Sequence, residues 1–159
     1  MEFEGAAKLS GARFTVLKGQ IARLRGAGPR SGPAVRADGV YVVPDRQGAL
    51  AGATMEAGRC DREIEPSALE HFRDLACRLF PALATAVING AAGVRAASPD
   101  GLPLAGLSSR PDVHLAVGAR RNGWLLAPLI AEIVCARMAG EAAGPWAARL
   151  DPLRDFRLH

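Results

Sequence analysis

The segment GARRNGWLLAP, residues 118–128, places two arginines and an asparagine between a strand-like apolar run and a helix-like apolar run. If the strand ends at Gly118, Asn122 falls at or near the N-cap of the helix, where its side chain can hold free backbone amides. Residues 123–125 then present unpaired N–H groups at the positive end of a helix dipole. Such a helix end binds an anion, or a group that becomes anionic in a reaction. The alternative is that Asn122 and Gly123 only cap the helix and turn the chain.

Two other side chains have types that suit a small carboxylate ligand. Arg95 ends an apolar run just before the turn SPDG at 98–101, and a guanidinium clamps a carboxylate through two parallel hydrogen bonds. Tyr41 is the only tyrosine and lies in the run VYVVP, whose alternation places it on one face with Val43. Its phenol could donate a hydrogen bond to a ligand. The alternatives are a solvated arginine and a tyrosine packed in the core.

The elements that would position these residues indicate an α+β fold with a mostly antiparallel sheet. Two main helices are predicted at about 66–80 and 124–139, since Pro66 suits a first helical turn and Gly140 a C-cap. The pair Asp38-Gly39 predicts a hairpin. Strands are expected at 13–18, 33–37, 40–44, 49–54, 84–96 and 112–118.

Composition excludes several classes of function. The 159 residues favour one domain, and the net charge of +4 comes from scattered arginines, without the basic, aromatic-interleaved block typical of nucleic-acid binding. The start of the chain does not resemble a signal peptide, and the longest apolar run, 124–131, is too short to span a membrane. Cys60, Cys77 and Cys135 have no metal-ligand spacing, so we expect no metal site and buried or half-buried thiols in a reducing, cytoplasmic protein.

The glycine-rich stretch GAGPRSG at 26–32 does not fit a dinucleotide-binding loop. That loop requires G-x-G-x-x-G between a strand and a helix, so that the helix N-terminus faces the pyrophosphate. Here the last glycine comes one residue late, Pro29 lies inside the loop, and a strand follows. We interpret this stretch as a turn.

Four ordered blocks, together with the tail DPLRDFRL, carry a resemblance to a known family. The blocks are KGQIARLRG (18–26), DGVYVVPDRQGALAGATMEAGRCD (38–61), AAGVRAASPDGLPLAG (91–106) and VGARRNGWLLAP (117–128). From about residue 18 to 158 the chain resembles the C-terminal portion of the D-amino-acid oxidase superfamily, and especially the glycine oxidases of thiamine biosynthesis. The resemblance implies that 25–159 form a substrate domain and the C-terminal, FAD-contacting portion of that fold.

The resemblance also implies roles for individual residues. Tyr41, Arg95 and Arg121 would contact the substrate, with Arg95 binding its carboxylate. Gly123 and the following helix amides would approach the pyrimidine end of the flavin, and the FAD-contacting residues would be Gly118, Asn122, Gly123, Trp124 and Leu125. The reaction would remove a hydride from the α-carbon of an amino acid or amine, after which O₂ reoxidises the flavin.

The chain departs from the family in three respects. It lacks the G-x-G-x-x-G half, and Arg120 and Ala91 stand where the family commonly has aromatic residues. The leading hypothesis is therefore an FAD-dependent oxidase of an amino acid or amine that requires a second chain carrying the FAD-binding half. The alternatives are a non-catalytic remnant that binds small carboxylates, and an unstable fragment with an exposed sheet edge.

Residues 3–24, FEGAAKLSGARFTVLKGQIARL, resemble a short segment of seryl-tRNA synthetase. The catalytic arginine and glutamate motifs of that enzyme do not follow, so synthetase activity is not expected. We interpret residues 1–24 as an N-terminal segment with a helix, a turn and a strand, and its origin stays open between a chimera, a disrupted reading frame and coincidence.

Overall fold

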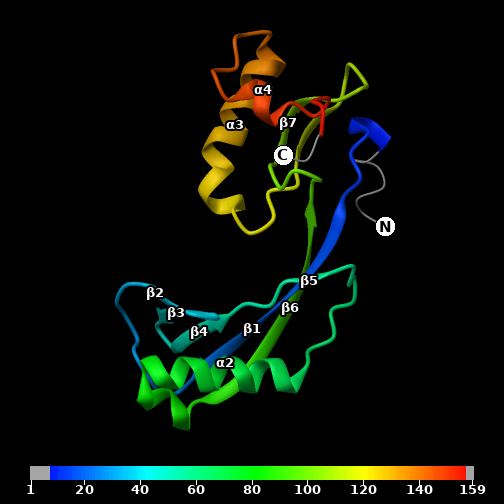
Figure 1. Cartoon of the computed structure of the whole chain (residues 1–159). Coiled ribbons are helices and arrows are strands. Elements are labelled where there is room, and N and C mark those ends of the chain that lie inside the picture. The colour runs from blue at the N-terminus through cyan, green and yellow to red at the C-terminus, as the bar shows by residue number, and fades with distance from the viewer. Residues whose placement is uncertain (1–7, 157–159) are drawn as a thin grey trace. The chain divides into compact units, whose positions relative to one another are not determined.

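The computed structural model describes residues 8–156, which divide into two compact units (Figure 1). Unit 1 comprises Met1–Leu17 and Arg95–His159, and unit 2 comprises Lys18–Val94. Strands β1 (Thr15–Arg25) and β6 (Val87–Ala97) each run from one unit into the other. The division therefore falls inside regular strands, without the Gly/Pro-rich linker that would mark it in the sequence.

The sheet of unit 2 is antiparallel where its register is recorded. Its strand order is β2-β3-β4-β1-β5, with β6 also paired to β1, and the shorter strands are β2 (Val35–Ala37), β3 (Val40–Asp45), β4 (Gly48–Gly52) and β5 (Glu56–Ala57). The predicted three-strand meander and its hairpin are confirmed, since Ala37 pairs with Val40 across Asp38-Gly39. Residues 26–32 join two strands, as predicted for a turn.

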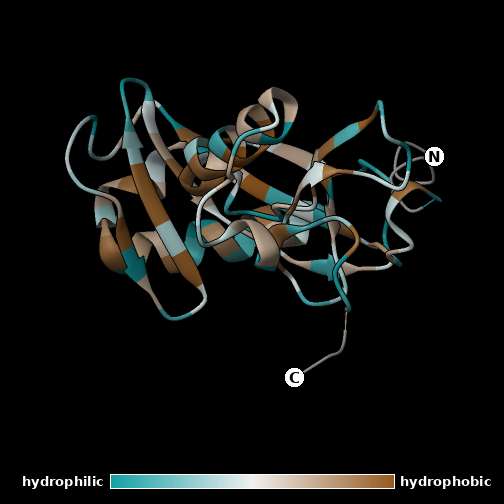
Figure 2. Ribbon diagram, turned by 90° about the horizontal axis from the view of Figure 1, so that it is seen from above, coloured by the Kyte–Doolittle hydropathy of each residue, from teal (hydrophilic) through white to brown (hydrophobic). Residues whose placement is uncertain are grey.

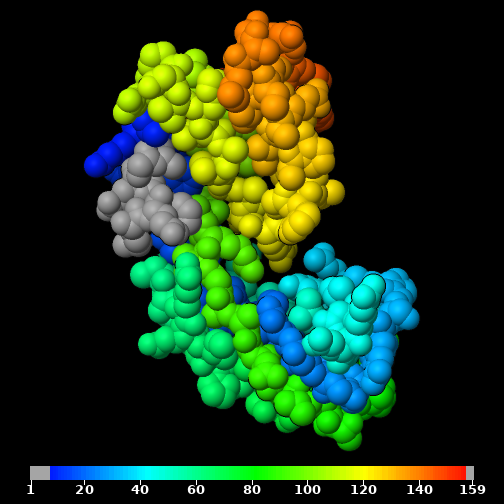
Figure 3. Space-filling model, turned by 180° about the vertical axis from the view of Figure 1, so that it is seen from behind, coloured from blue at the N-terminus to red at the C-terminus, as the bar shows by residue number. Residues whose placement is uncertain are grey.

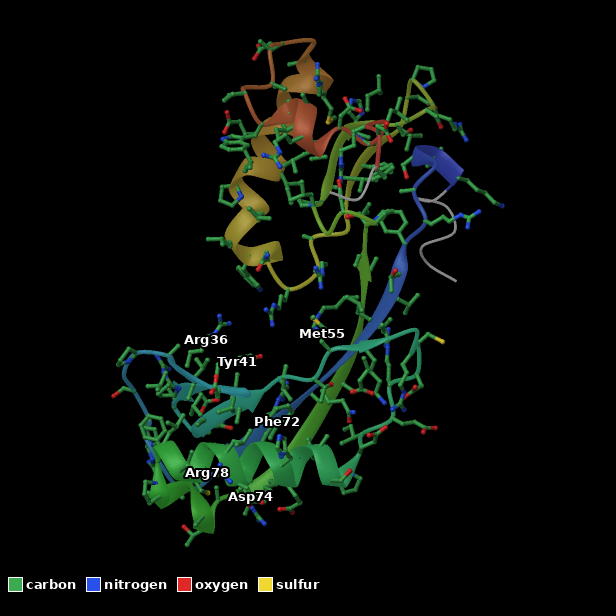
Figure 4. The ribbon with its side chains drawn as sticks, in the orientation of Figure 1. Arg36, Tyr41, Met55, Phe72, Asp74 and Arg78 are labelled. Carbon is green, nitrogen blue, oxygen red and sulfur yellow. The ribbon has the colours of Figure 1, made fainter. Side chains whose placement is uncertain are left out.

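Helix α2 (Pro66–Leu79) covers one face of this sheet (Figure 1). Leu69, Phe72 and Ala76 recur at helical spacing and are buried, and Phe72 lies between the helix and the sheet in Figure 4. They pack on inward-facing sheet residues such as Val42 and Leu24. Along the strands, hydrophobic and hydrophilic residues mix (Figure 2), which is typical of a sheet with one covered face. The predicted first helix is confirmed to within one residue, and the short 3₁₀ helix η1 (Pro81–Thr85) follows it.

The turn between β3 and β4 depends on glycine at position 48. Gly48 has φ +147°, a conformation that other residues rarely adopt, and a Cβ there would lie 2.0 Å from the carbonyl oxygen of Leu24. The backbones of β1 and β4 therefore approach closely only because residue 48 has no side chain.

A polar network joins the residues after β4 to β1. Lys18 is fully buried, and its Nζ lies 2.5 Å from Oδ1 of Asp61. Gln20 is also buried and donates from Nε2 to Glu56, while its side-chain oxygen Oε1 accepts from the backbone N–H of Glu65. Arg59 forms ion pairs with the carboxylates at 56, 61 and 65. The buried polar groups are thus satisfied by a segment that would otherwise be a loose loop.

This network predicts a dependence of stability on pH. The hydrogen bonds from Lys18 and then Arg59 hold the pKa of Asp61 well below its ordinary value. Because the pKa is lowered in the folded protein, the stabilisation is complete above the unfolded value, about 3.9, and is lost as pH falls below it. We expect the urea midpoint to fall between pH 5 and pH 3 by more in the wild type than in Asp61→Asn.

The matched control is Asp74→Asn, an exposed aspartate on α2 in the same unit. It should keep the wild-type fall in the urea midpoint. Equal pH dependence in the wild type and in Asp61→Asn would contradict the assigned role of the network.

Between residues 95 and 156, unit 1 contains a two-stranded antiparallel sheet and two α-helices. The strands are β7 (Leu104–Leu107) and β8 (His114–Val117), and the helices are α3 (Gly123–Ala139) and α4 (Ala147–Leu150). Helix α3 begins one residue before its predicted start and ends in a left-handed Gly140, as predicted. Strand β7 was not predicted, because four residues flanked by turns carry no measurable period. The α+β class with a mostly antiparallel sheet is confirmed.

A charged pair ties the C-terminal segment of unit 1 to the turn after β6. Arg154 donates from Nε and Nη2 to the two carboxylate oxygens of Asp100, at 2.8 and 2.9 Å, and from Nη2 to the carbonyl oxygen of Leu102. Burial opposes ionisation of Asp100, but the hydrogen bonds from Arg154, the backbone N–H of Leu102 and the hydroxyl of Ser98 together outweigh it and lower the pKa of that carboxyl to about 2. The ring of Phe156 lies against the same guanidinium.

This geometry predicts that lysine cannot replace Arg154. The side chains of Arg154 and Asp100 are only 9% and 18% exposed, and an ammonium cannot form the two parallel bonds. We expect Arg154→Lys to lower the free energy of unfolding by about 1–3 kcal/mol in a urea titration. Arg110→Lys, at an exposed pair with Asp112, should change it by less than about 0.5 kcal/mol. Equal losses in the two variants would contradict the assigned role.

The structure tests the expected burial of the three cysteines. Cys77 is half-buried as expected, but the expectation of buried or half-buried thiols is wrong for Cys60 and Cys135. These two are exposed because they lie in the segment after β5 and on the outer side of α3.

Among residues 8–156, none of the helices combines the length and the apolarity needed to cross a membrane. The start of the synthetase-like segment, residues 3–7, and the end of the oxidase-like segment, residues 157 and 158, lie outside the described residues.

Candidate active site

The segment between β8 and α3 is anchored by one backbone bridge to the end of β6. Ala119 pairs with Ala97 in an isolated antiparallel bridge. Gly118, just before it, is buried with φ +79°, and a Cβ there would lie 3.3 Å from the ring of Phe14. Arg95 precedes this bridge by two residues and Arg121 follows it by two. A single pairing therefore holds the backbone segments that carry two of the predicted substrate contacts.

Asn122 occupies the N-cap of α3, as predicted, but its side chain makes no capping hydrogen bond. The expectation that this side chain holds the free amides is therefore wrong, because the backbone N–H of Asn122 instead closes a turn onto the carbonyl of Ala119 (2.9 Å). The first helical bond runs from Leu126 N–H to Asn122. Within residues 8–156, the amides of Gly123, Trp124 and Leu125 thus have no backbone acceptor, which is the arrangement required for an anion or a carbonyl oxygen.

The surroundings of these amides are open. The side chain of Trp124 is 97% exposed and that of Leu125 is 78% exposed. A Cβ on Gly123 would contact only Ala119, at 3.9 Å. A planar group can therefore approach the N-terminus of α3 without displacing protein atoms.

The two predicted arginines of unit 1 have no fixed partner within the described chain. Arg121 is exposed and Arg95 half-buried, and neither forms a hydrogen bond or an ion pair with residues 8–156. With the dipole of α3 they make the end of β6 and the start of α3 positively charged. This arrangement can bind a carboxylate.

Arg120 does not belong to this group. The backbone of Arg120 has φ +52°, an uncommon value for a residue with a side chain. Its Nη1 lies close to Gly101: a Cβ added to Gly101 would be 3.0 Å from that atom. Arg120 therefore packs against the 98–101 turn. This contact accounts for a residue that the sequence left unexplained.

Tyr41 lies in unit 2, on the face of the sheet that α2 does not cover (Figure 4). The register aligns it with Arg36 on one side and Gly52 on the other, and Gly52 in turn pairs with Ile21. The side chain of Ile21 occupies the space at Gly52, since a Cβ there would lie 2.8 Å from Cγ2 of Ile21. Arg36 is exposed, shares this face and was not singled out from the sequence. The two-residue hairpin at Asp38-Gly39 is the signal that could have found it, since it pairs residue 36 with residue 41.

The donors that the described residues offer fit part of an FAD molecule. The free amides of α3 suit the carbonyl and nitrogen edge of a flavin, which accept hydrogen bonds. The glycine-rich turn at 26–32 does not offer a comparable cradle for a pyrophosphate, because it connects two strands. No group of three or more His, Cys, Asp and Glu within residues 8–156 could hold a metal ion.

An apolar cavity of about 260 Å³ lies in unit 1, between α3, α4 and the segment before β7. It contains none of the predicted site residues. Its lining residues are Leu102, Pro103, Leu126, Leu129, Trp146, Arg149 and Leu150.

Known proteins resemble this chain over most of its length. It is 39% identical over 141 residues to the tRNA 5-methylaminomethyl-2-thiouridine biosynthesis bifunctional protein MnmC of Caulobacter vibrioides, covering 84% of this chain and 22% of that protein. It is 33% identical over 127 residues to the glycine oxidase of Pseudomonas putida, covering 78% and 35%. The chain thus spans between about a fifth and a third of the length of these relatives.

A solved structure shows the same fold. The crystal structure of glycine oxidase from Geobacillus kaustophilus superposes with a TM-score of 0.74 and 27% identity, over 92% of this chain and 40% of that one. A separate match to the serine–tRNA ligase of Rhodospirillum centenum is 78% identical but spans only 27 residues, 17% of this chain and 6% of the ligase. The predicted resemblance to amino-acid oxidases is confirmed: the FAD dependent oxidoreductase family matches residues 5–137, and the chain belongs to that family.

Proposed function

We propose that this chain is the substrate-side part of an FAD-dependent oxidase that acts on a small amino acid or amine, as a glycine oxidase does. It would act together with a polypeptide that carries the FAD-binding part. The observation that carries this proposal is the start of α3, where the amides of Gly123–Leu125 are free beside the exposed Arg121. A family member needs such donors at the flavin, and no described residue occupies them.

The FAD, when bound, would accept the hydride and later pass the electrons to O₂. The contribution of this chain would be binding and orientation. Arg95 and Arg121 would hold the substrate carboxylate, and the phenol of Tyr41 would face the substrate. Gly118 would keep the turn tight, while Asn122 would start the helix and Gly123, Trp124 and Leu125 would contact the flavin. Trp124 and Leu125 would also exclude water once covered.

The cellular setting forms part of the proposal. One of the curated relatives is named as a glycine oxidase, and another as a tRNA 5-methylaminomethyl-2-thiouridine biosynthesis protein. A third is the bifunctional protein ThiO/ThiG of a Nostoc species, 34% identical over 139 residues. A role in thiamine biosynthesis in the cytoplasm is consistent with the glycine-oxidase-like assignment.

The decisive experiment joins this chain covalently to the FAD-binding part of the Pseudomonas putida glycine oxidase, the part that it does not match. We expect a yellow protein that releases peroxide from glycine, sarcosine or a D-amino acid. A colourless, folded fusion that makes no peroxide would contradict the proposal. If that colourless protein still bound glycolate in calorimetry, and lost binding in Arg95→Ala, the chain would be a carboxylate-binding module.

A prediction for the fusion concerns Arg95. Arg95→Ala should raise KM for glycine roughly 10- to 100-fold, because each charge-assisted hydrogen bond to the carboxylate contributes about 1.5–3 kcal/mol. Arg110→Ala removes an exposed cation of the same unit and should leave KM within about twofold. Steady-state peroxide assays measure both values, and an unchanged KM in Arg95→Ala would refute the assigned contact.

A further inference from the structure

The phenol of Tyr41 lies between an apolar neighbour and a cation. The strand register aligns Arg36, Tyr41, Gly52 and Ile21 in one row across β2, β3, β4 and β1, and this row is here called the Tyr41 row. On one side of Tyr41, Ile21 fills the space at Gly52. On the other side lies the guanidinium of Arg36, the charged side chain of the row, on the last strand of the sheet order.

Arg36 and Tyr41 stand directly opposite each other in the hairpin of β2 and β3. The Cβ atoms of such a cross-strand pair lie about 4.5–5.5 Å apart, and the two side chains extend from the same face of the sheet. Figure 4 shows both side chains on the side away from α2. A ligand that touches the phenol of Tyr41 therefore comes within reach of the guanidinium of Arg36.

This guanidinium has no counter-ion in the described chain. Arg36 is exposed and forms no hydrogen bond or ion pair with residues 8–156. The nearest carboxylates in sequence are those of Asp38 and Asp45, and the second of these accepts from the backbone N–H of Gln47. By contrast, Arg59 of the same unit is paired with three carboxylates. The cation beside Tyr41 is thus available to an external anion.

The charges of unit 2 favour an anion on the same strands. Residues 18–52, which form β1 to β4, contain six basic and two acidic side chains, whereas residues 53–80, which include β5 and α2, contain four basic and six acidic ones. The positive part of the unit therefore carries the Tyr41 row and attracts anions to it. Figure 3 shows β2 to β4 (light blue to cyan) at the surface of this unit.

We propose that Arg36 is a specificity-determining residue that binds a second acidic group of the substrate. This inference rests on the proposed function for the presence of the substrate at Tyr41. A guanidinium holds a carboxylate through two parallel hydrogen bonds, and it repels a cation. The substrate class is then an amino acid or amine with two carboxylates, such as D-aspartate, whereas glycine leaves Arg36 without a partner.

The test uses the fusion of the full chain with the FAD-binding part of the Pseudomonas putida glycine oxidase. D-Aspartate and D-asparagine have nearly the same shape and differ in the charge of the side chain. We expect kcat/KM, from peroxide release, to be roughly 10- to 100-fold higher for D-aspartate, as one charge-assisted interaction provides. D-Glutamate and D-glutamine repeat the comparison with a side chain one methylene longer.

Two variants and a control assign this preference to Arg36. Arg36→Gln should reduce the ratio of the two kcat/KM values to within about twofold of one, and Arg36→Glu should favour D-asparagine. Arg23 is an exposed arginine on the same face, two strands from Tyr41 and thus roughly 10 Å away across the sheet. Because salt screens an exposed charge at that distance, Arg23→Gln should keep the wild-type ratio.

A binding measurement gives the same comparison without turnover. Calorimetry of the fusion should show succinate binding roughly 10- to 100-fold more tightly than its monoamide, succinamate. Arg36→Gln should remove this difference, and Arg23→Gln should retain it. A change in the fold alone would weaken both ligands equally and leave their ratio unchanged.

The inference and the proposed function can fail separately. A fusion that oxidises glycine but gains nothing from the second carboxylate, or whose preference survives in Arg36→Gln, would overturn the inference and keep the proposed function. A fusion that oxidises no amine, yet binds succinate above succinamate through Arg36, would keep the anion site and contradict the proposed function. A fusion with neither activity nor binding would overturn both.

Discussion

The pairing of β1 with three other strands is the constraint on which the sheet depends. One long strand supplies buried Ala22 and Leu24 to the core under α2, and supplies Lys18 and Gln20 to the polar network. Its register with β4 aligns Ile21 with Gly52, and Gly52 in turn aligns with Tyr41. Because successive side chains of a strand point to opposite faces, a slip by one residue would expose Ala22 and Leu24 and bury Arg23 and Arg25. The position of Tyr41 on the uncovered face follows from this register.

The start of α3 depends on a similar backbone constraint. Gly118 turns the chain in a space that the ring of Phe14 limits, and the bridge between Ala119 and Ala97 then fixes where the turn begins. The N–H of Asn122 is used within the turn, so the next three amides remain free. Strand pairing and turn geometry, more than any side chain of the segment, thus determine which donors are available to a ligand.

Local patterns made much of this fold predictable. The period of 3.6 residues with Pro66 and Gly140 at the ends located both main helices, and Asp38-Gly39 located the hairpin. Strand β7 was missed because so short a run has no period, and the extension of β1 to Arg25 was missed because Gly19 and Gln20 interrupt its apolar run. The division into two units could not be predicted, since it lies within β1 and β6.

The site was predictable in part. The N-cap position of Asn122 followed from the flanking runs, whereas the packing of Arg120 on the 98–101 turn depends on a positive φ that no local pattern indicates. Arg36 was missed because it lies beside Tyr41 only through the pairing of β2 with β3. The roles assigned to Tyr41, Arg95 and Arg121 came from family resemblance and stay predictions.

The central claim is that this chain orients a small amino acid or amine at a flavin. The most direct measurement is the visible absorption of the fusion with the FAD-binding part when glycine, sarcosine or a D-amino acid is added in the absence of oxygen. The account predicts that the flavin band bleaches with at least one of them and returns when air is admitted. A yellow fusion whose absorption is unchanged by all three would contradict it.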